Sequence, residues 1–224
     1  MCDERPAPVK KPHTKNSSTL SRRVSFPEDE KKLPWLALLL DAHAIADTGT
    51  AIAIRDEEKR RKSKLACSKG CGNCCAYQKD LPLYPHELVG IYWYVTEKME
   101  ASVRRILKSR LADHSAGSPC PFLVDRSCSI HPVRPLGCRQ FNVFTTPCVP
   151  NEDPYYTRRD DVLVPLPQYT DRVFIAVLPF YNMKQEGGIV AAIKLIRSQI
   201  MNLQDFDWKK LVVVIEQSDT LSPQ

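Results

Sequence analysis

The chain has 224 residues, a mass of 25.5 kDa and nine cysteines, eight of which fall between Cys67 and Cys148. Nine of 224 residues is about 4%, whereas a small secreted disulfide scaffold exceeds roughly 8–10% cysteine in a much shorter chain. An odd number also leaves one thiol unpaired in any scheme made only of disulfides. The composition excludes a disulfide-dense secreted domain and indicates one globular domain, with or without a tail.

The N-terminal residues show no apolar stretch behind a basic start, so no secretory signal is predicted. The longest uninterrupted apolar run, Trp35–Leu40, has six residues, far fewer than the ~20 that a membrane helix needs. We therefore expect a cytoplasmic protein with no membrane partner. In that reducing compartment, clustered cysteines bind metal more often than they form disulfides.

The formal net charge of +6 is not concentrated on one element. Residues 1–66 hold 14 Lys and Arg against 10 Asp and Glu, and the rest of the chain holds 18 against 16. If a metal ionises several cysteines, that second part becomes neutral or acidic. We expect no nucleic-acid partner, because no segment has a concentrated basic face. The expected partner is a protein or a small-molecule substrate whose identity the sequence leaves open.

Residues 1–32 are rich in proline, lysine, serine and acidic residues, which predicts a disordered tail ahead of a single domain over 33–224. A helix is predicted from about Pro34. Apolar positions then recur at helical spacing, namely Leu36, Leu39, Leu40 and His43. On this stripe His43 is expected to be packed and hydrogen-bonded, and the charged run 55–64 to continue as exposed helix surface.

A second helix is predicted to open at Pro85, followed by an acid in its first turn and apolar positions at helical spacing as far as Leu107. It either spans about 25 residues or breaks and resumes. His86 and His114 lie at its two ends and are expected to be solvated.

Residues 119–170 contain nine prolines, at positions 119, 121, 132, 135, 147, 150, 154, 165 and 167. This density forbids long helices and predicts an irregular segment. Residues 173–178 form a short buried strand or a helical turn, residues 189–203 a helix, and residues 211–215 a closing strand or short buried segment. The fold class is therefore mainly α, with helices packed around an irregular, proline-rich, cysteine-ligated metal-binding core.

The cysteines form two groups. The first is Cys67, Cys71, Cys74 and Cys75; the second is Cys120, Cys128 and Cys138, with Cys148 as a candidate eighth ligand. Spacings of two and three residues let a short loop turn several sulfurs toward one ion, and Gly70 and Gly72 permit the positive φ that such a loop needs. Adjacent Cys74 and Cys75 indicate either two centres or one ligand beside a packed thiol. Cys2 is a spare thiol in the tail.

The choice of metal lies between zinc and iron. Structural zinc takes four ligands from cysteine pairs, with or without histidine, whereas iron–sulfur clusters prefer thiolates. An all-cysteine, histidine-poor set leans toward an iron–sulfur cluster or iron, with zinc as the alternative. The spacing of Cys67, Cys71 and Cys74 is also that of the radical SAM loop, but the proline-rich loops and helices that follow do not predict the barrel of those enzymes.

The combined pattern over roughly residues 65–150 resembles the YkgJ-type cysteine-cluster family, a zinc- or iron-chelating group with a C-x₃-C-x₂-C-C signature. The family consists mostly of uncharacterised metal-binding proteins of bacteria. Its motif also occurs in flagellin lysine methylases, which implies an iron–sulfur centre coupled to methyl transfer. The family often has tyrosine at the position of His131, so His131 ranks below the cysteines as a ligand. Arg134 and Arg139 are expected to hydrogen-bond loop carbonyls or carboxylates, or to screen thiolate charge.

Two functions follow from these observations. The first is a metal-binding protein that holds an iron–sulfur centre or iron through cysteine thiolates and has a redox or transferase role. The second is a non-enzymatic zinc-binding module for structure or interaction. No nucleophile–base pair, phosphate-binding loop or paired carboxylates accompany the cysteines, so the sequence does not decide whether the protein is an enzyme.

Overall fold

A computed structural model describes residues 23–68, 70–183 and 188–221 of the chain. Helices dominate this part, and its strands have two residues each, so the predicted mainly α fold is confirmed. Several helices begin at a proline, namely α1, α2, α4, α7 and α8. Proline suits this position because its fixed φ matches a helix and the N–H it lacks has no partner in the first turn.

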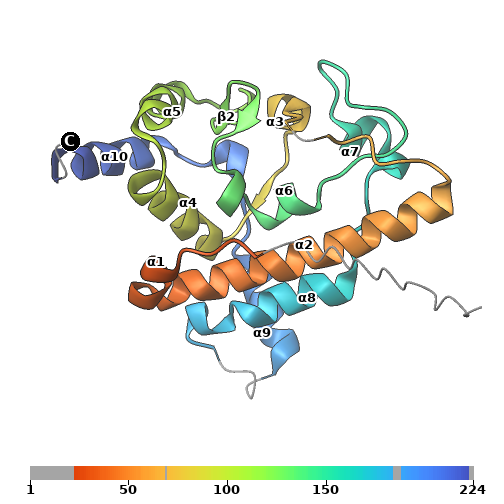
Figure 1. Ribbon diagram of the computed structural model, residues 1–224, viewed down its shortest axis with the longest axis horizontal. Helices are drawn as coiled ribbons and strands as arrows, with labels where there is room; N and C mark the ends of the chain where they lie inside the picture. Colours follow the sequence, from red (N-terminus) through yellow and green to blue (C-terminus); the bar gives the residue numbers. More distant parts are fainter. Residues whose placement is uncertain (1–22, 69, 184–187, 222–224) are drawn as a thin grey trace, which may run out of the picture.

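The long helix α2 (Pro34–Arg61) runs across the molecule and packs against α1, α4, α6 and α8 (Figure 1). Its buried residues recur at helical spacing, as predicted: Leu36, Leu39, Leu40, Ala42, His43, Ala46, Gly49 and Ala53. Helix α8 (Pro167–Ala176) lies along α2, and α9 (Ile189–Ser198) packs on α8. Residues 173–178 belong to the end of α8 and the 3₁₀ turn Leu178–Tyr181, so they are helical.

Ordered structure begins ahead of the predicted domain boundary at residue 33. Helix α1 (Pro27–Lys32) packs against α2, and the Phe26 ring meets the edge of Trp93 with centroids 5.0 Å apart. Arg23 donates to Glu30 at 2.8 Å and to Asp41 of α2 at 2.6 Å. The prediction of a disordered tail is therefore wrong for residues 23–32, while residues 1–22 lie outside the described part.

Helices α4 (Pro85–Glu97), α5 (Ala101–Asp113) and α10 (Lys209–Leu221) pack together at one end of the molecule (Figure 1). The second predicted helix therefore breaks after Glu97 and resumes. Of the two alternatives for residues 211–215, the closing strand is wrong and the short buried segment is confirmed, because these residues lie in α10, where Leu211 and Ile215 face the core at 0% exposure. A short apolar run of β-branched residues does not distinguish a strand from one buried turn of helix.

Short elements fill the middle of the chain, as the prolines predict. Strand β1 (Pro82–Leu83) pairs antiparallel with β4 (Met201–Asn202), and β2 (Leu123–Val124) pairs antiparallel with β3 (Ser127–Cys128). The short helices of this region are α3 (Asn73–Tyr77), which precedes β1, and α6 (Leu136–Gln140) and α7 (Pro154–Thr157), which follow β3. Helix α9 ends at Ser198, so Ile200, which the sequence placed on the same stripe, lies beyond it and is 51% exposed.

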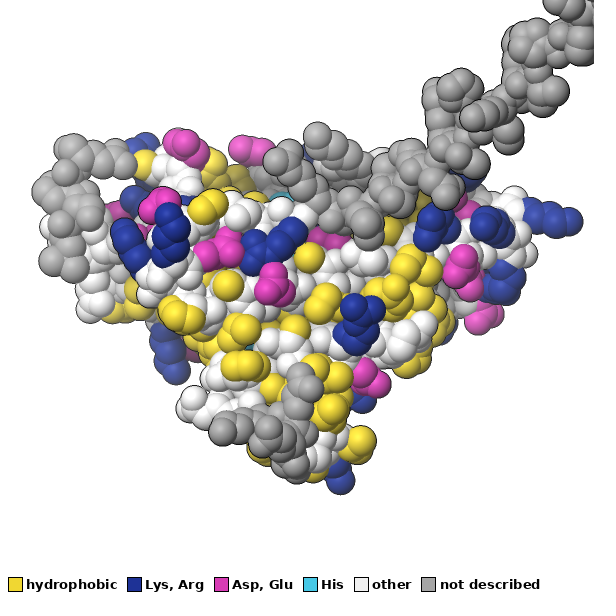
Figure 2. Space-filling view, turned by 60° about the horizontal axis from the view of Figure 1, so that its bottom comes forward, with side chains coloured by type: hydrophobic (Ala, Val, Ile, Leu, Met, Phe, Trp, Pro, Cys, Tyr) yellow, Lys and Arg dark blue, Asp and Glu magenta, His cyan; other side chains and the backbone are white. Residues whose placement is uncertain are grey.

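Among the described residues, α2 is the helix whose length and composition would allow it to cross a membrane, with a mean hydropathy of 1.3 over its most apolar window. Of that window 44% is buried inside the molecule, and α2 packs against α1, α4, α6 and α8, as a core helix does. On the face in Figure 2, Lys and Arg side chains lie among Asp, Glu and hydrophobic ones rather than in one basic patch.

The contact between α2 and α8 depends on Gly49. A Cβ built there would lie 2.5 Å from the Cβ and Cγ of Tyr169, so the two backbones approach more closely than alanine allows. In an ordinary helix site, Gly→Ala stabilises by about 1 kcal/mol. Gly49→Ala should instead lower the free energy of unfolding by about 1–3 kcal/mol because Tyr169 must move. Urea denaturation measures this, with the exposed-site change Lys59→Ala as the control. A gain in stability from Gly49→Ala would contradict the packing.

Candidate metal centre

All eight described cysteines line one cavity of about 530 Å³. They come from the first group, the second group and the loop after α6: Cys67, Cys71, Cys74, Cys75, Cys120, Cys128, Cys138 and Cys148. None of them is paired in a disulfide. The structure therefore brings together every described residue that the sequence singled out as a metal ligand. Cys2 lies outside the described residues.

The loop that follows α2 positions Cys67 and Cys71. Ala66 N donates to Val143 O at 2.9 Å, which holds Cys67 beside the segment that follows α6. The Sγ of Cys67 also accepts a hydrogen bond from Val143 N at 3.3 Å. Gly70 has φ +81°, the left-handed conformation predicted for it, and Cys71 is exposed after this turn.

Helix α3 carries Cys74 and Cys75. Its first flanking residue, Gly72, has φ −112°, so the predicted positive φ is wrong there. Gly72 is needed for another reason, because a Cβ would lie 2.5 Å from the carbonyl oxygen of Arg126 in the β2–β3 turn. Cys75 O also accepts from Cys120 N at 2.7 Å. These close approaches join the first cysteine group directly to the second.

A tight hairpin presents Cys128. The two residues between β2 and β3, Asp125 and Arg126, both have positive φ, +47° and +61°. This is the pattern of a type I′ turn, whose twist suits a two-residue hairpin. Ser129 N then donates to Phe122 O at 2.9 Å. The hairpin returns Cys128 to the same cavity as Cys120.

A buried carboxylate places Cys138. Glu87, 1% exposed, accepts from Tyr84 N at 2.9 Å at the start of α4 and from Leu136 N at 2.6 Å at the start of α6. Burial raises the pKa of Glu87 to about 7, although these two hydrogen bonds act in the opposite direction. One side chain thus joins the first turns of two helices, and Cys138 lies one turn into the second.

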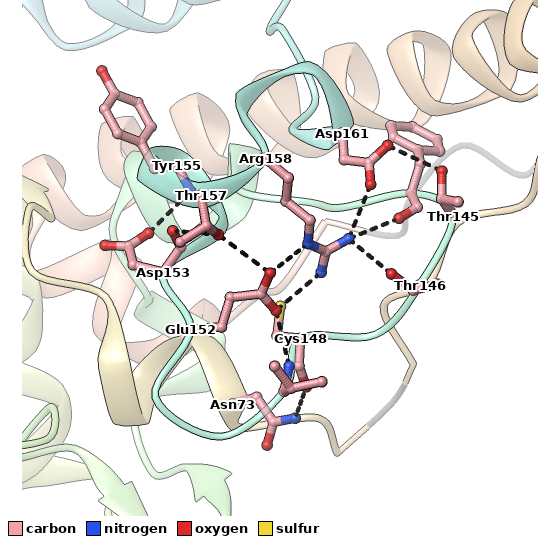
Figure 3. A network of polar contacts seen from close by, with 12 residues as sticks. Asn73, Thr145, Thr146, Cys148, Glu152, Asp153, Tyr155, Thr157, Arg158 and Asp161 are labelled. Atoms are coloured by element: carbon pink, nitrogen blue, oxygen red, sulfur yellow. Dashed lines mark hydrogen bonds and ion pairs between the residues drawn. The ribbon is translucent and has the colours of Figure 1, made fainter.

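Arg158 organises the loop that carries Cys148 (Figure 3). Its guanidinium donates to Glu152 at 2.7 Å, to Asp161 at 3.1 Å and to the carbonyl oxygen of Phe144 at 3.3 Å. Asn73 Nδ2, at the start of α3, donates to the carbonyl oxygen of Cys148 at 2.7 Å. The loop is therefore tied to the helix of Cys74 and Cys75, and Cys148 is buried at 6% exposure.

Most of these thiols resist ionisation. Burial raises the pKa of Cys67, Cys120, Cys128 and Cys138 above the ordinary value, and raises the pKa of Cys148 to about 11. For Cys74 the hydrogen bond with Cys75 is the largest cause of its raised pKa, followed by burial. Thiolates in this cavity therefore need a cation to offset the loss of hydration.

The two arginines of the second group differ. Arg139, 4% exposed, donates to the carbonyl oxygens of Arg134 at 2.9 Å and Pro132 at 2.7 Å and to Asp47 of α2 at 2.7 Å. This matches its predicted bonding to carbonyls and carboxylates. Arg134 instead lines the thiol cavity, and its buried Nε has no hydrogen-bond partner in the described part of the chain. Exposed His131 also lines the cavity.

The other histidines in the described part of the chain, His43, His86 and His114, are structural. His43 is 4% exposed and its Nδ1 lies 3.1 Å from Arg139 Nη2, as predicted for a packed histidine. The prediction that His86 and His114 are solvated is wrong. His86 is 2% exposed with its Nδ1 2.8 Å from Tyr181 Oη, and half-buried His114 contacts the carbonyl oxygen of Gln204 at 2.9 Å. Their partners are 95 and 90 residues away in the chain, beyond the reach of local patterns.

The donor set fits a thiophilic metal. Eight thiols, one imidazole and one free guanidinium line the cavity, and carboxylates are absent from its described lining. Among the described residues, however, no three Cys, His, Asp or Glu side chains are gathered tightly enough to form a coordination sphere as they stand. The chemistry of the site therefore fits zinc or iron, and coordination requires the thiols to move closer together.

Residues 66–161 match the family model CxxCxxCC, described as a putative zinc- or iron-chelating domain. The matched segment is less than half of the 224-residue chain, and it is this segment that is similar to the family. The match confirms the resemblance drawn from the cysteine spacing, and it contains all eight described cysteines. Neither a curated protein nor a solved structure matches the chain.

Elements outside the CxxCxxCC domain complete its surroundings. Helix α2 supplies Asp47 and His43 to Arg139, and Leu203, just after β4, lines the thiol cavity. These contacts join the domain to both flanking parts of the chain. They had no signal in the sequence, since Asp47 and Leu203 belong to no motif.

Glu87 makes the stability of the CxxCxxCC domain depend on pH. Its pKa rises from 4.5 to about 7, so the folded state holds this proton more tightly than the unfolded chain. Its contribution is complete below pH 4.5 and is lost as the pH rises through about 7. Relative to Glu87→Gln, the unfolding free energy of the unaltered protein should fall by ~3 kcal/mol across this interval. Urea denaturation over a pH series measures it, and two parallel curves would show that Glu87 does not titrate there.

Proposed function

We propose that this chain holds an iron–sulfur centre or iron through the cysteine thiolates of its CxxCxxCC domain. The observation that carries the proposal is the convergence of eight thiols, from segments up to 81 residues apart (Cys67 to Cys148), on one cavity. Iron–sulfur clusters prefer thiolate ligands, and the described lining offers eight thiols against one imidazole.

The charges around the cavity support a thiolate-bound cation. Arg134 is a permanent cation whose Nε lies buried without a partner among the described residues, and a guanidinium cannot lose its charge to avoid that cost. Arg139 and Arg158 are already paired with Asp47, Glu152 and Asp161. A metal centre bound by several thiolates carries net negative charge, which would give Arg134 its counter-ion.

A redox or transferase role for this centre is the finer part of the proposal. Cys71 is exposed, so one side of the thiol set is open to a small molecule or to a partner protein. Arg134 and His131 line the same cavity and can hydrogen-bond a bound anionic group. The bound centre would supply electron transfer or Lewis acidity, and these residues would orient what approaches it.

The second candidate is a zinc-binding module without catalytic activity. Eight thiols lining one cavity, with burial raising the pKa of thiols such as Cys120 and Cys138, also suit structural zinc, which is closed by four ligands and lowers the pKa of each bound thiol. Burial of Cys120 at 5% exposure and its place in the main core favour a structural role for at least that thiol.

Anaerobic purification with metal and acid-labile sulfide analysis separates the two candidates. We expect a brown protein that contains iron and acid-labile sulfide, and Cys128→Ser should lower the metal content because a hydroxyl is a poor substitute for a thiolate. Cys2→Ser is the matched control and should leave the metal content unchanged. A colourless protein with stoichiometric zinc would replace the first proposal by the second, and a protein that binds neither metal would refute both.

Metal removal should loosen the segment that the thiols gather. The proline-rich chain between Cys67 and Cys148 has few ladder hydrogen bonds, so metal–thiolate bonds would carry part of its folding free energy. Chelation, or Cys71→Ser, should expose residues 67–148 to limited proteolysis and alter the circular dichroism spectrum. Unchanged proteolysis and dichroism after complete metal removal would rule out this structural role.

A further inference from the structure

Six of the described thiols divide by what they pack against: Cys67 and Cys148 lie in a small loop cluster, whereas Cys75, Cys120, Cys128 and Cys138 lie in or against the main core. We propose that the eight thiols form two four-thiolate centres, an outer set of Cys67, Cys71, Cys74 and Cys148 and an inner set of Cys75, Cys120, Cys128 and Cys138. This inference rests on the proposed metal binding and adds the number of centres and their ligands.

Two members of the outer set, Cys67 and Cys148, belong to a small hydrophobic cluster, and a third, Cys71, is exposed. Cys67 packs against buried Cys148, together with Val143 and Val162. The bond from Asn73 to the Cys148 carbonyl holds this loop against α3 beside Cys74.

The inner set lies against the main hydrophobic core. Cys120 belongs to that core, and Cys75, Cys128 and Cys138 pack against it. Cys75 is tied to Cys120 through the 2.7 Å backbone hydrogen bond, which assigns Cys75 rather than Cys74 to this set.

The adjacent pair on α3 explains how two centres fit in one cavity. Neighbouring residues on a helix point in directions about 100° apart, so Cys74 and Cys75 cannot readily serve one small ion. Cys74 and Cys75 lie next to each other on α3, and both line the same cavity. The two centres therefore lie side by side, and the helix divides the thiols between them.

The two centres should differ in accessibility. The outer set contains exposed Cys71, whereas Cys120 of the inner set is 5% exposed and its neighbours pack on the core. An open site exchanges ligands more readily than a closed one. The outer centre is therefore the one that a substrate or a chelator reaches first, and the inner centre is the structural one.

Titration with Co²⁺ measures the number of centres, because tetrahedral thiolate-bound Co²⁺ has a strong sulfur-to-metal charge-transfer absorption. The reduced, metal-stripped full chain should saturate at two equivalents of Co²⁺, and a chelator should then remove the metal in two kinetic phases of equal size. Saturation at one equivalent, or removal in a single phase, would overturn the two-centre arrangement while leaving metal binding intact. No binding of Co²⁺, zinc or iron would refute the proposed function itself.

Paired variants assign the ligands. Cys67→Ser with Cys148→Ser should halve the Co²⁺ content and abolish the fast phase, while Cys120→Ser with Cys138→Ser should halve it and abolish the slow phase. Cys2→Ser is the control and should retain both equivalents. Loss of both equivalents from the outer pair would indicate one shared centre and overturn the division. If the double variant of the inner pair does not fold, the Co²⁺ stoichiometry of the unaltered chain and of the Cys67/Cys148 double variant still tests the two-centre arrangement.

Discussion

Hydrogen bonds from buried charged side chains to loop backbone hold the cysteine-bearing segment in place. The span from 119 to 170 has nine prolines, and its described ladder is a two-residue hairpin with isolated bridges. Glu87 fixes the start of α6, Arg139 holds the carbonyls before it, and Arg158 holds the following loop. Each replaces hydrogen bonds that a sheet would otherwise provide, and burial makes the bonds of Glu87 and Arg139 costly to lose.

These side chains also determine where the thiols lie. Glu87 starts the helix of Cys138, Arg158 shapes the loop of Cys148, and close backbone contact at Gly72 brings α3 against the hairpin of Cys128. The resulting cavity removes thiols from water and raises their pKa values, which disfavours thiolates in the absence of a cation. The same packing leaves Arg134 without an anionic partner among the described residues. Both costs fall when a metal binds, because thiolates then ionise beside the metal and the guanidinium.

The sequence predicted what depends on local chemistry and missed what depends on distant contacts. The helix from Pro34, the helical spacing after Pro85 and the irregular proline-rich span all follow from residues near in the chain, whereas the break between α4 and α5 was left open. Cysteine spacing identified the thiols that converge, although it did not predict how they divide. The solvation of His86 was mispredicted because its partner, Tyr181, is 95 residues away. The segment 211–215 was ambiguous because a short apolar run suits a strand or a buried helical turn equally.

The division of the thiols follows from the way the domain is enclosed. One set packs on the core built by α4, α5 and α10, so its surroundings are fixed by the same apolar contacts that stabilise the fold. The other set rests on loops at 65–68 and 141–148, where a small cluster and the Arg158 network provide the support. Loops held by hydrogen bonds open more easily than a packed core. A centre on the loops can therefore exchange what it binds while a centre on the core keeps the fold together.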